Sequence, residues 1–121
     1  MSAFSFNPFT GTFDKVVREW TRFAGIVPAG QTVVVDTVPL ADLIGSKYVV
    51  ALSNETETNG NFLELNVLNL TSNLKSNVFS KLKGTLDTEI DAIINGSNME
   101  VSVKNNEVFN VNYNVLRTLF N

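Results

Sequence analysis

The chain has 121 residues, the length of a single domain, and a domain of this size buries enough apolar surface to fold without disulfides or metals. It contains neither cysteine nor histidine, which excludes disulfides, thiolate or imidazole metal sites and Ser-His-Asp catalysis. Nine basic and twelve acidic residues give a net charge of −3, which argues against a protein that tracks nucleic-acid phosphates. We therefore expect no enzyme activity, no cofactor and no nucleic-acid partner.

The N-terminus lacks a basic region followed by an apolar core, so we expect no secretory signal. No apolar run is long enough to span a bilayer, and we expect no membrane partner. These features predict synthesis in a cytosol.

Residues 1–26 differ from the rest of the chain because large aromatic side chains gather in them. Their spacing from Phe13 to Trp20 fits a short helix over Asp14 to Phe23, and an extended segment fits equally well. A segment this aromatic either covers the open end of the chain's own domain or anchors it to another protein. We predict a docking arm over residues 1–26, with these protein-interface anchors: Phe4, Phe6, Phe9, Phe13 and Trp20.

The next segments read as two strands joined by a corner. Gln31 to Val38 is rich in β-branched residues and lies between a Pro-Ala-Gly turn and Pro39, which predicts a strand. Leu40 to Gly45 fits one helical turn or an irregular corner. Ser46 to Ser53 predicts a second strand, and the Asn-Gly dipeptide that follows it predicts a turn.

The remaining chain predicts further strands separated by turn residues. Phe62 to Leu70 alternates apolar and polar residues, with a phase change near its end that indicates a bulge or the end of the strand. Leu86 to Ile94 is ambiguous between strand and helix. The other predicted strands are Val78 to Leu82, Met99 to Lys104 and Val108 to Leu119. About seven strands at regular spacing predict an all-β fold, an antiparallel, jelly-roll-like β-sandwich over residues 27–121.

Acidic pairs are the first candidates for chemistry. Glu55 and Glu57, and likewise Glu89 and Asp91, could share a strand face, as ordinary solvated carboxylates do. Asp87, Glu89 and Asp91 alternate as calcium ligands could, but they lack the glycine and terminal glutamate of an EF-hand loop. We predict no metal site and no catalytic residue.

Asparagine is over-represented, with sixteen copies that interleave with apolar residues. Neutral amides give a sheet polar surface without charge, which suits a protein whose copies pack against one another. Tyr48 and Tyr113, with nearby asparagines, fit a sheet core as well as a sugar-binding surface.

Several segments, taken in order, resemble a module of tailed-bacteriophage virion structural proteins. The stretch Val27–Ser53 resembles its first two strands, above all at Gly-Ser-Lys-Tyr-Val-Val. The later matches are Phe62–Leu68, Lys83–Ile93, Asn98–Val103 and Val111–Leu119, and Phe6–Asp14 resembles the NPFTGTFD openings of phage tail and fibre proteins. The turn that usually follows the module's third strand is absent, and Leu68–Thr71 takes its place.

The resemblance implies a β-sandwich without catalysis, present in several copies around a symmetry axis of a virion. We therefore expect a virion structural protein that binds other virion proteins through its arm and forms a homo-oligomer, a trimer first. Within the virion we expect a tail, fibre-attachment or neck component. A capsid decoration protein (cement or head-fibre) and a carbohydrate-binding sandwich for host recognition are the alternatives. Synthesis would take place in the cytoplasm of the bacterial host.

Overall fold

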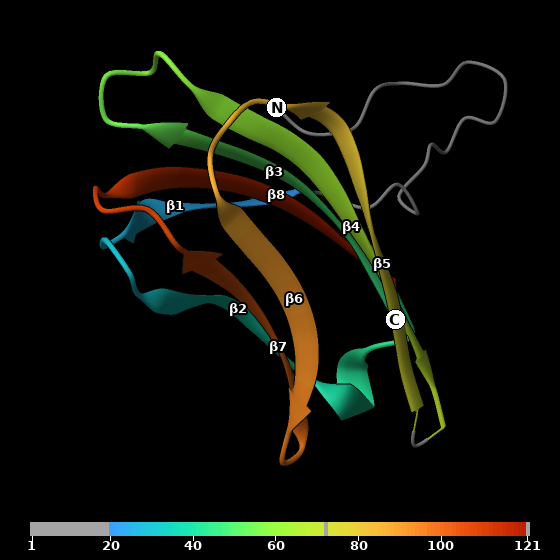
Figure 1. Cartoon of the computed structure of the whole chain (residues 1–121). Helices are drawn as coiled ribbons and strands as arrows, with labels where there is room; N and C mark the ends of the chain where they lie inside the picture. The colour runs from blue at the N-terminus through green and yellow to red at the C-terminus, as the bar shows by residue number, and fades with distance from the viewer. Residues whose placement is uncertain (1–19, 72, 121) are drawn as a thin grey trace, which may run out of the picture.

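The computed structural model describes residues 20–71 and 73–120 and places most of them in eight β-strands (Figure 1). The strands are β1 (Thr21–Val27), β2 (Thr32–Pro39), β3 (Gly45–Asn54), β4 (Gly60–Leu70), β5 (Asn73–Lys83), β6 (Thr88–Asn95), β7 (Asn98–Asn105) and β8 (Val111–Phe120). One 3-10 turn, Leu40–Asp42, forms the predicted corner between β2 and β3. No helix in this part of the chain has the length and apolar character needed to cross a membrane.

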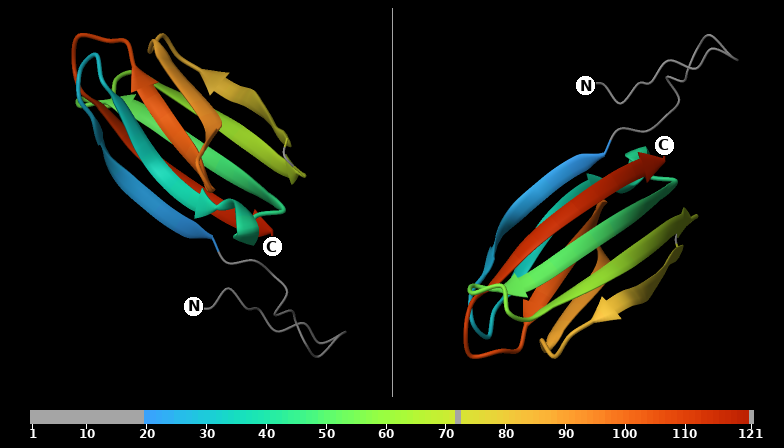
Figure 2. Two further views of the ribbon diagram at one scale, coloured as in Figure 1. Left: turned by 90° about the horizontal axis from the view of Figure 1, so that it is seen from below. Right: turned by 90° about the horizontal axis from the view of Figure 1, so that it is seen from above.

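The strands form two antiparallel sheets packed face to face, as the two layers in Figure 2 show. The first sheet has five strands in the order β1-β8-β3-β4-β5, and the second has three in the order β2-β7-β6. Hairpins join β3 to β4, β4 to β5 and β6 to β7, while the other connections cross between the sheets. This arrangement confirms the predicted antiparallel sandwich. The division into five and three strands is a detail that the prediction did not contain.

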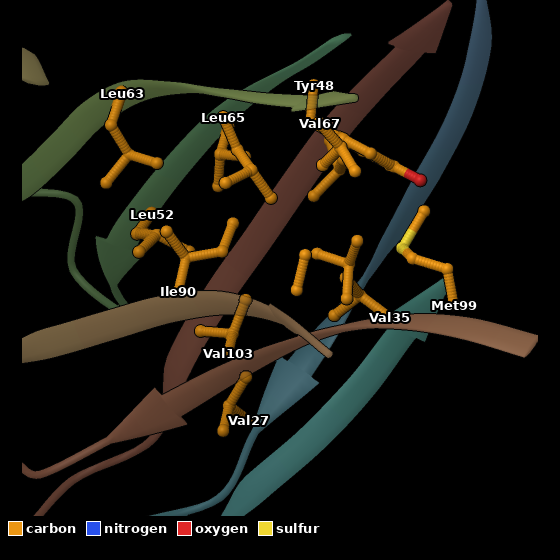
Figure 3. Packing of buried hydrophobic residues seen from close by; sticks show 14 of the residues in the cluster. Val27, Val35, Tyr48, Leu52, Leu63, Leu65, Val67, Ile90, Met99 and Val103 are labelled. Atoms are coloured by element: carbon orange, nitrogen blue, oxygen red, sulfur yellow. The ribbon is translucent and has the colours of Figure 1, made fainter. Parts of the chain in front are cut away.

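The core forms because each strand alternates inward apolar and outward side chains. In β4, Leu63, Leu65 and Val67 point inward and are buried, as the period-two pattern predicted. Met99 and Val103 of β7 meet them from the opposite sheet (Figure 3). The three-stranded sheet covers the inner face of its five-stranded partner only in part: Val78 of edge strand β5 opposes Leu65 yet remains 47% exposed.

Strand β1 lies in the stretch that the sequence assigned to the arm. Residues 21–26 pair with β8, with Thr21 opposite Arg117, so they belong to the five-stranded sheet and the sandwich begins before Val27. Residues 21–23 are extended, which excludes the helical alternative there. Gly25 permits this pairing, because a Cβ at that position would lie 2.7 Å from the Tyr113 hydroxyl.

Three other predictions are refined. The ambiguous Leu86–Ile94 segment contains strand β6, and the last strand begins at Val111 because Val108 and Phe109 lie in the preceding loop. The phase change in β4 marks the end of the strand, since pairing with β5 is regular up to Leu70. The bulge lies at the other end of this pair, between the partners of Phe62 and Leu63.

Candidate protein interface

The outer face of the five-stranded sheet carries a continuous apolar patch. The strand register places Leu116 of β8 opposite Val49 of β3, and Ala51 opposite Phe62 of β4. Strand β5 extends the patch, because Phe62 is opposite Leu82 and Glu64 is opposite Phe79. Side chains opposite each other on neighbouring strands contact one another on the same face. We call this set the outer apolar patch: Val49, Ala51, Phe62, Phe79, Leu82 and Leu116.

The patch is open to solvent, and its most exposed part lies on edge strand β5. Leu82 is 71% exposed and Phe79 is 58% exposed. The bulge in β5 produces this arrangement: Leu63 is paired with Ser80 and Phe62 with Leu82, so one extra residue in β5 brings Leu82 to the outer face. Contiguous apolar surface of this kind marks interaction sites in soluble proteins.

A shallow hollow of about 220 Å³ lies on the side of the patch formed by β8, β3 and β4. It forms around Ala51, whose methyl group is short, between the larger side chains of neighbouring strands. Its lining includes Phe62 and Leu116 on the apolar side and Arg22 and Asn114 on the polar side. Arg22 Nη2 donates a 2.7 Å hydrogen bond to Asn114 Oδ1, so the polar side of the hollow is internally paired.

A charge pair next to the patch is also satisfied within the sheet. Lys47 Nζ lies 3.4 Å from Glu64 Oε2, and both residues face outward on adjacent strands. The exposed lysine limits the energetic value of this pair to well under about 1 kcal/mol. The pair also has a structural effect. The Glu64 carboxylate lies between the apolar side chains of Val49 and Phe79, and Lys47 provides it with a cationic partner.

Of the five predicted interface anchors, the structure describes one. Trp20 directly precedes β1, at the edge of the five-stranded sheet, and its side chain is 48% exposed. The other four, Phe4, Phe6, Phe9 and Phe13, lie outside the described residues, and their role stays a prediction.

A second cluster of polar groups lies buried between the two sheets. The hydroxyl of Tyr48 on β3 donates a 2.6 Å hydrogen bond to Asp36 Oδ2 on β2. Arg117 of β8 donates from Nη1 to both carboxylate oxygens, at 3.1 and 3.2 Å, and its guanidinium lies 5.3 Å from the ring centre of Phe23. Burial first, and the hydrogen bond to Asp36 second, raise the pKa of the Tyr48 hydroxyl well above its ordinary value. The tyrosine is therefore a neutral donor that ties the sheets together.

Sequence reasoning missed this cluster because a bulge creates it. Within β2 the register shifts between Val34 and Asp36, so Val35 and Asp36 are both buried although they are neighbours. Strict alternation would have placed one of them outside. Of the two interpretations of Tyr48, the sheet-core one is confirmed and sugar stacking is excluded, because the residue is fully buried. Tyr113 is half-buried on the inner side of β8.

Some asparagines hold loops instead of covering sheet faces. Asn105 is fully buried, and its Nδ2 donates to the carbonyl oxygens of Val27, Pro28 and Phe109. Asn61, also buried, donates to the Leu86 carbonyl. Others, such as Asn66 and Asn77 on the outer face, do supply the uncharged polar surface that the composition predicted.

The acidic candidates lie apart from the patch. Glu55 and Glu57 lie in the turn after β3, so the prediction that they could share a strand face is wrong. Glu89 and Asp91 do share the exposed face of β6, and Glu89 and Asp87 each accept a hydrogen bond from Asn106. Across residues 20–71 and 73–120, no group of three or more acidic side chains is arranged to hold a metal ion.

Comparison with known proteins yields a fold and no family. No family model matches the sequence, and no curated protein matches it. A solved structure with similar architecture is the tailspike protein gp49 of Acinetobacter baumannii bacteriophage Fri1, a capsular polysaccharide depolymerase, at 14% identity and a TM-score of 0.50. The match covers 83% of this chain and 17% of that one. The tailspike protein of Acinetobacter baumannii phage AM24 matches at 6% identity and a TM-score of 0.45, over 84% of this chain and 26% of that one. This chain therefore has the fold of a part of the gp49 tailspike and spans a small share of its length.

Proposed function

We propose that this chain is a structural protein of a tailed-phage virion, located in the tail, at the fibre attachment or in the neck, and that it assembles through protein contacts without catalysis. The observation that carries the proposal is the outer apolar patch, an open apolar surface on a fold shared with part of a phage tailspike. The sequence motifs that resemble phage virion proteins support the same class independently of the fold.

The contact surface is the outer face of the five-stranded sheet. Phe62 and Leu116 would fill complementary hollows of a partner, and the depression around Ala51 would accept a partner's side chain. Large side chains buried at the centre of an interface dominate its binding energy, and truncating one such anchor costs about 2 kcal/mol or more. Among the described side chains, Lys47 with Glu64 and Arg22 with Asn114 already have partners within the sheet, so a partner protein would not have to neutralise them.

Two measurements on purified virions test whether the chain is a virion protein and where in the virion it lies. Purified virions of the phage that encodes the chain are digested and quantified by mass spectrometry, and gold-labelled antibodies locate the chain by electron microscopy. We expect a fixed copy number per particle and label at the tail or neck. Absence from particles would refute the proposal. Label confined to the head would reject the tail location in favour of capsid decoration.

Matched substitutions test the surface. Leu116→Asn alters the patch, and Val34→Asn alters a similarly exposed aliphatic residue on the outer face of the three-stranded sheet. We expect Leu116→Asn to reduce incorporation of the chain into particles by at least about tenfold, the equivalent of 1.4 kcal/mol, and Val34→Asn to leave it unchanged. Equal incorporation of both variants would show that assembly uses another face.

Carbohydrate binding is a second candidate, because the hollow combines the Phe62 ring with the Asn114 amide and the Arg22 guanidinium. Titration of the purified chain with capsular polysaccharide fragments separates the two functions. Binding that Phe62→Ala abolishes would favour the sugar site, and release of new reducing ends would contradict the non-enzymatic assignment. The assembly proposal expects neither.

A further inference from the structure

We propose, building on the proposed virion function, that the outer apolar patch of each chain is covered by the N-terminal aromatic segment, residues 4–13, of a neighbouring copy. The contact would join identical chains, each of which donates one arm and accepts another. Three observations carry this inference: the chemistry of the two surfaces, the direction in which the chain enters the sheet, and the length of the arm.

The arm and the patch match in polarity. The first thirteen residues, Met-Ser-Ala-Phe-Ser-Phe-Asn-Pro-Phe-Thr-Gly-Thr-Phe, contain four phenylalanines and no charged side chain. The patch offers exposed apolar side chains, and the neighbouring charges of Lys47 and Arg22 have partners within the sheet. Burying the four phenylalanines against this surface adds no charged side chain to the contact, and the Glu64 carboxylate that it covers has Lys47 as its cationic partner.

The direction of the chain favours a neighbour's patch over the chain's own. The described chain begins at Trp20 and enters edge strand β1 opposite Arg117, near the end of β8. Residues 15–19, Lys-Val-Val-Arg-Glu, contain none of the glycine, proline, asparagine, aspartate or serine residues that a tight reversal uses. Continuing without a reversal, these five residues carry the chain about 7 Å (helical) to 17 Å (extended) away from its own sheet before it reaches Asp14 and Phe13.

The length of the arm is sufficient to cross a neighbouring sheet. Nineteen residues precede Trp20, which corresponds to a reach of up to about 60 Å when extended. Five strands about 4.8 Å apart make a sheet roughly 20 Å wide. Phe4 and Phe6 alternate as side chains on one face of an extended segment do, so both can contact the same surface. Contacts that run from donor to acceptor close into a ring if the rotation between copies permits it.

The absence of cysteine from the chain makes disulfide trapping a clean test. Full-length Phe9→Cys chains are mixed with full-length Ala51→Cys chains that carry a mass tag, and the mixture is oxidised mildly. Ala51 lines the hollow, and Val49→Cys serves as a second acceptor position if Ala51→Cys does not fold. Ser102→Cys, on the outer face of the three-stranded sheet, is the matched control acceptor.

We expect Phe9→Cys to form disulfides with the patch cysteine about a thousandfold faster than with the control, because docking raises the effective concentration from about micromolar to about millimolar. A chain carrying both Phe9→Cys and Ala51→Cys should give linked multimers on a denaturing gel. Trapping at the control rate would overturn the inference. A double variant that links only within one chain would also overturn it, since the arm would then cover its own sheet.

The outcome is separable from that of the proposed function. Trapping is measured on the isolated protein, whereas the virion assignment depends on the composition of particles. Control-rate trapping with the chain present in virions would reject the exchanged arm and retain the structural role. Efficient trapping with the chain absent from virions would retain the exchanged arm and reject the structural role in the virion.

Discussion

Replacing Tyr48 with phenylalanine removes one atom from the buried cluster that joins the two sheets. The ring of Tyr48 is fully buried on β3, and its hydroxyl donates a 2.6 Å hydrogen bond to Asp36 on β2 of the opposite sheet. Phenylalanine keeps the packing of the ring and deletes only the donor. Asp36 retains the two hydrogen bonds from Arg117, so the carboxylate stays paired.

The size of the effect follows from these contacts. A hydrogen bond to a charged group contributes about 1.5–3 kcal/mol, and we expect Tyr48→Phe to lower the free energy of unfolding at pH 7 by about 2 kcal/mol. For a chain of this length, each kcal/mol corresponds to about 4 °C in Tm, so the midpoint should fall by about 8 °C. Removing Arg117 would cost more, because the buried Asp36 carboxylate would lose its cationic partner.

Alkaline pH provides an independent signature of the same hydroxyl. Burial and the hydrogen bond to Asp36 raise the pKa of Tyr48 above its ordinary value of 10.0, so the folded chain keeps a proton that the unfolded chain loses. The stabilisation is complete below pH 10 and declines as the pH rises further, at up to about 1.4 kcal/mol per pH unit. Tyr48→Phe lacks this titration, so its stability should approach that of the parent as the pH increases.

Urea unfolding followed by far-ultraviolet circular dichroism, from pH 7 to pH 11, measures both effects. Tyr113→Phe is the matched control, because it removes the hydroxyl of a half-buried tyrosine on β8. A loss below about 0.5 kcal/mol at pH 7, the range of an ordinary surface substitution, would refute the reasoning. A constant difference between parent and Tyr48→Phe throughout the alkaline range would refute the titration argument alone.

Three further substitutions test other parts of the fold. Asn105→Ala leaves several buried backbone groups without a partner, and we expect a loss of about 3 kcal/mol or more in urea unfolding. Gly60→Ala places a Cβ 2.5 Å from the Leu52 carbonyl oxygen. We expect this clash to lower the free energy of unfolding by about 1–3 kcal/mol, which thermal unfolding would show as a lower Tm. Lys47→Ala removes an exposed partner of Glu64, and a stability change above about 1 kcal/mol would contradict our view of that pair.

Local alternation predicted the strands whose neighbours lie close in sequence. Strands β4 and β7 follow the period-two pattern that the burial of their side chains confirms. Strand β1 was assigned to the arm, because its partner β8 lies about ninety residues further along the chain and nothing in the local sequence indicates that pairing. The contact of Phe23 with Arg117 and the close approach of Gly25 to Tyr113 arise only once β1 is paired with β8.

The candidate interface depended on information that no single segment contains. Leu116, Val49 and Phe62 become neighbours only through the order of the strands in the sheet. Alternation showed that each strand has two faces, but it could not show which apolar residues of the outer face lie side by side. Asp36 could not be recognised for a related reason, since a one-residue bulge turns its side chain inward where strict alternation with Val35 would place it outside.

The pairing of the first strand with the last also sets the order of folding. Strand β1 leaves the ribosome early, but its partner residues in β8, such as Arg117 opposite Thr21, are made 96 residues later. At 5–20 residues per second this interval lasts about 5–20 s, and such distant pairings fold slowly in any case. During this interval β1 and the aromatic segment before it have no strand to pair with. Strand β1, which follows the segment that we propose to join neighbouring copies, is therefore made well before its partner strand and can enter the sheet only once β8 is complete.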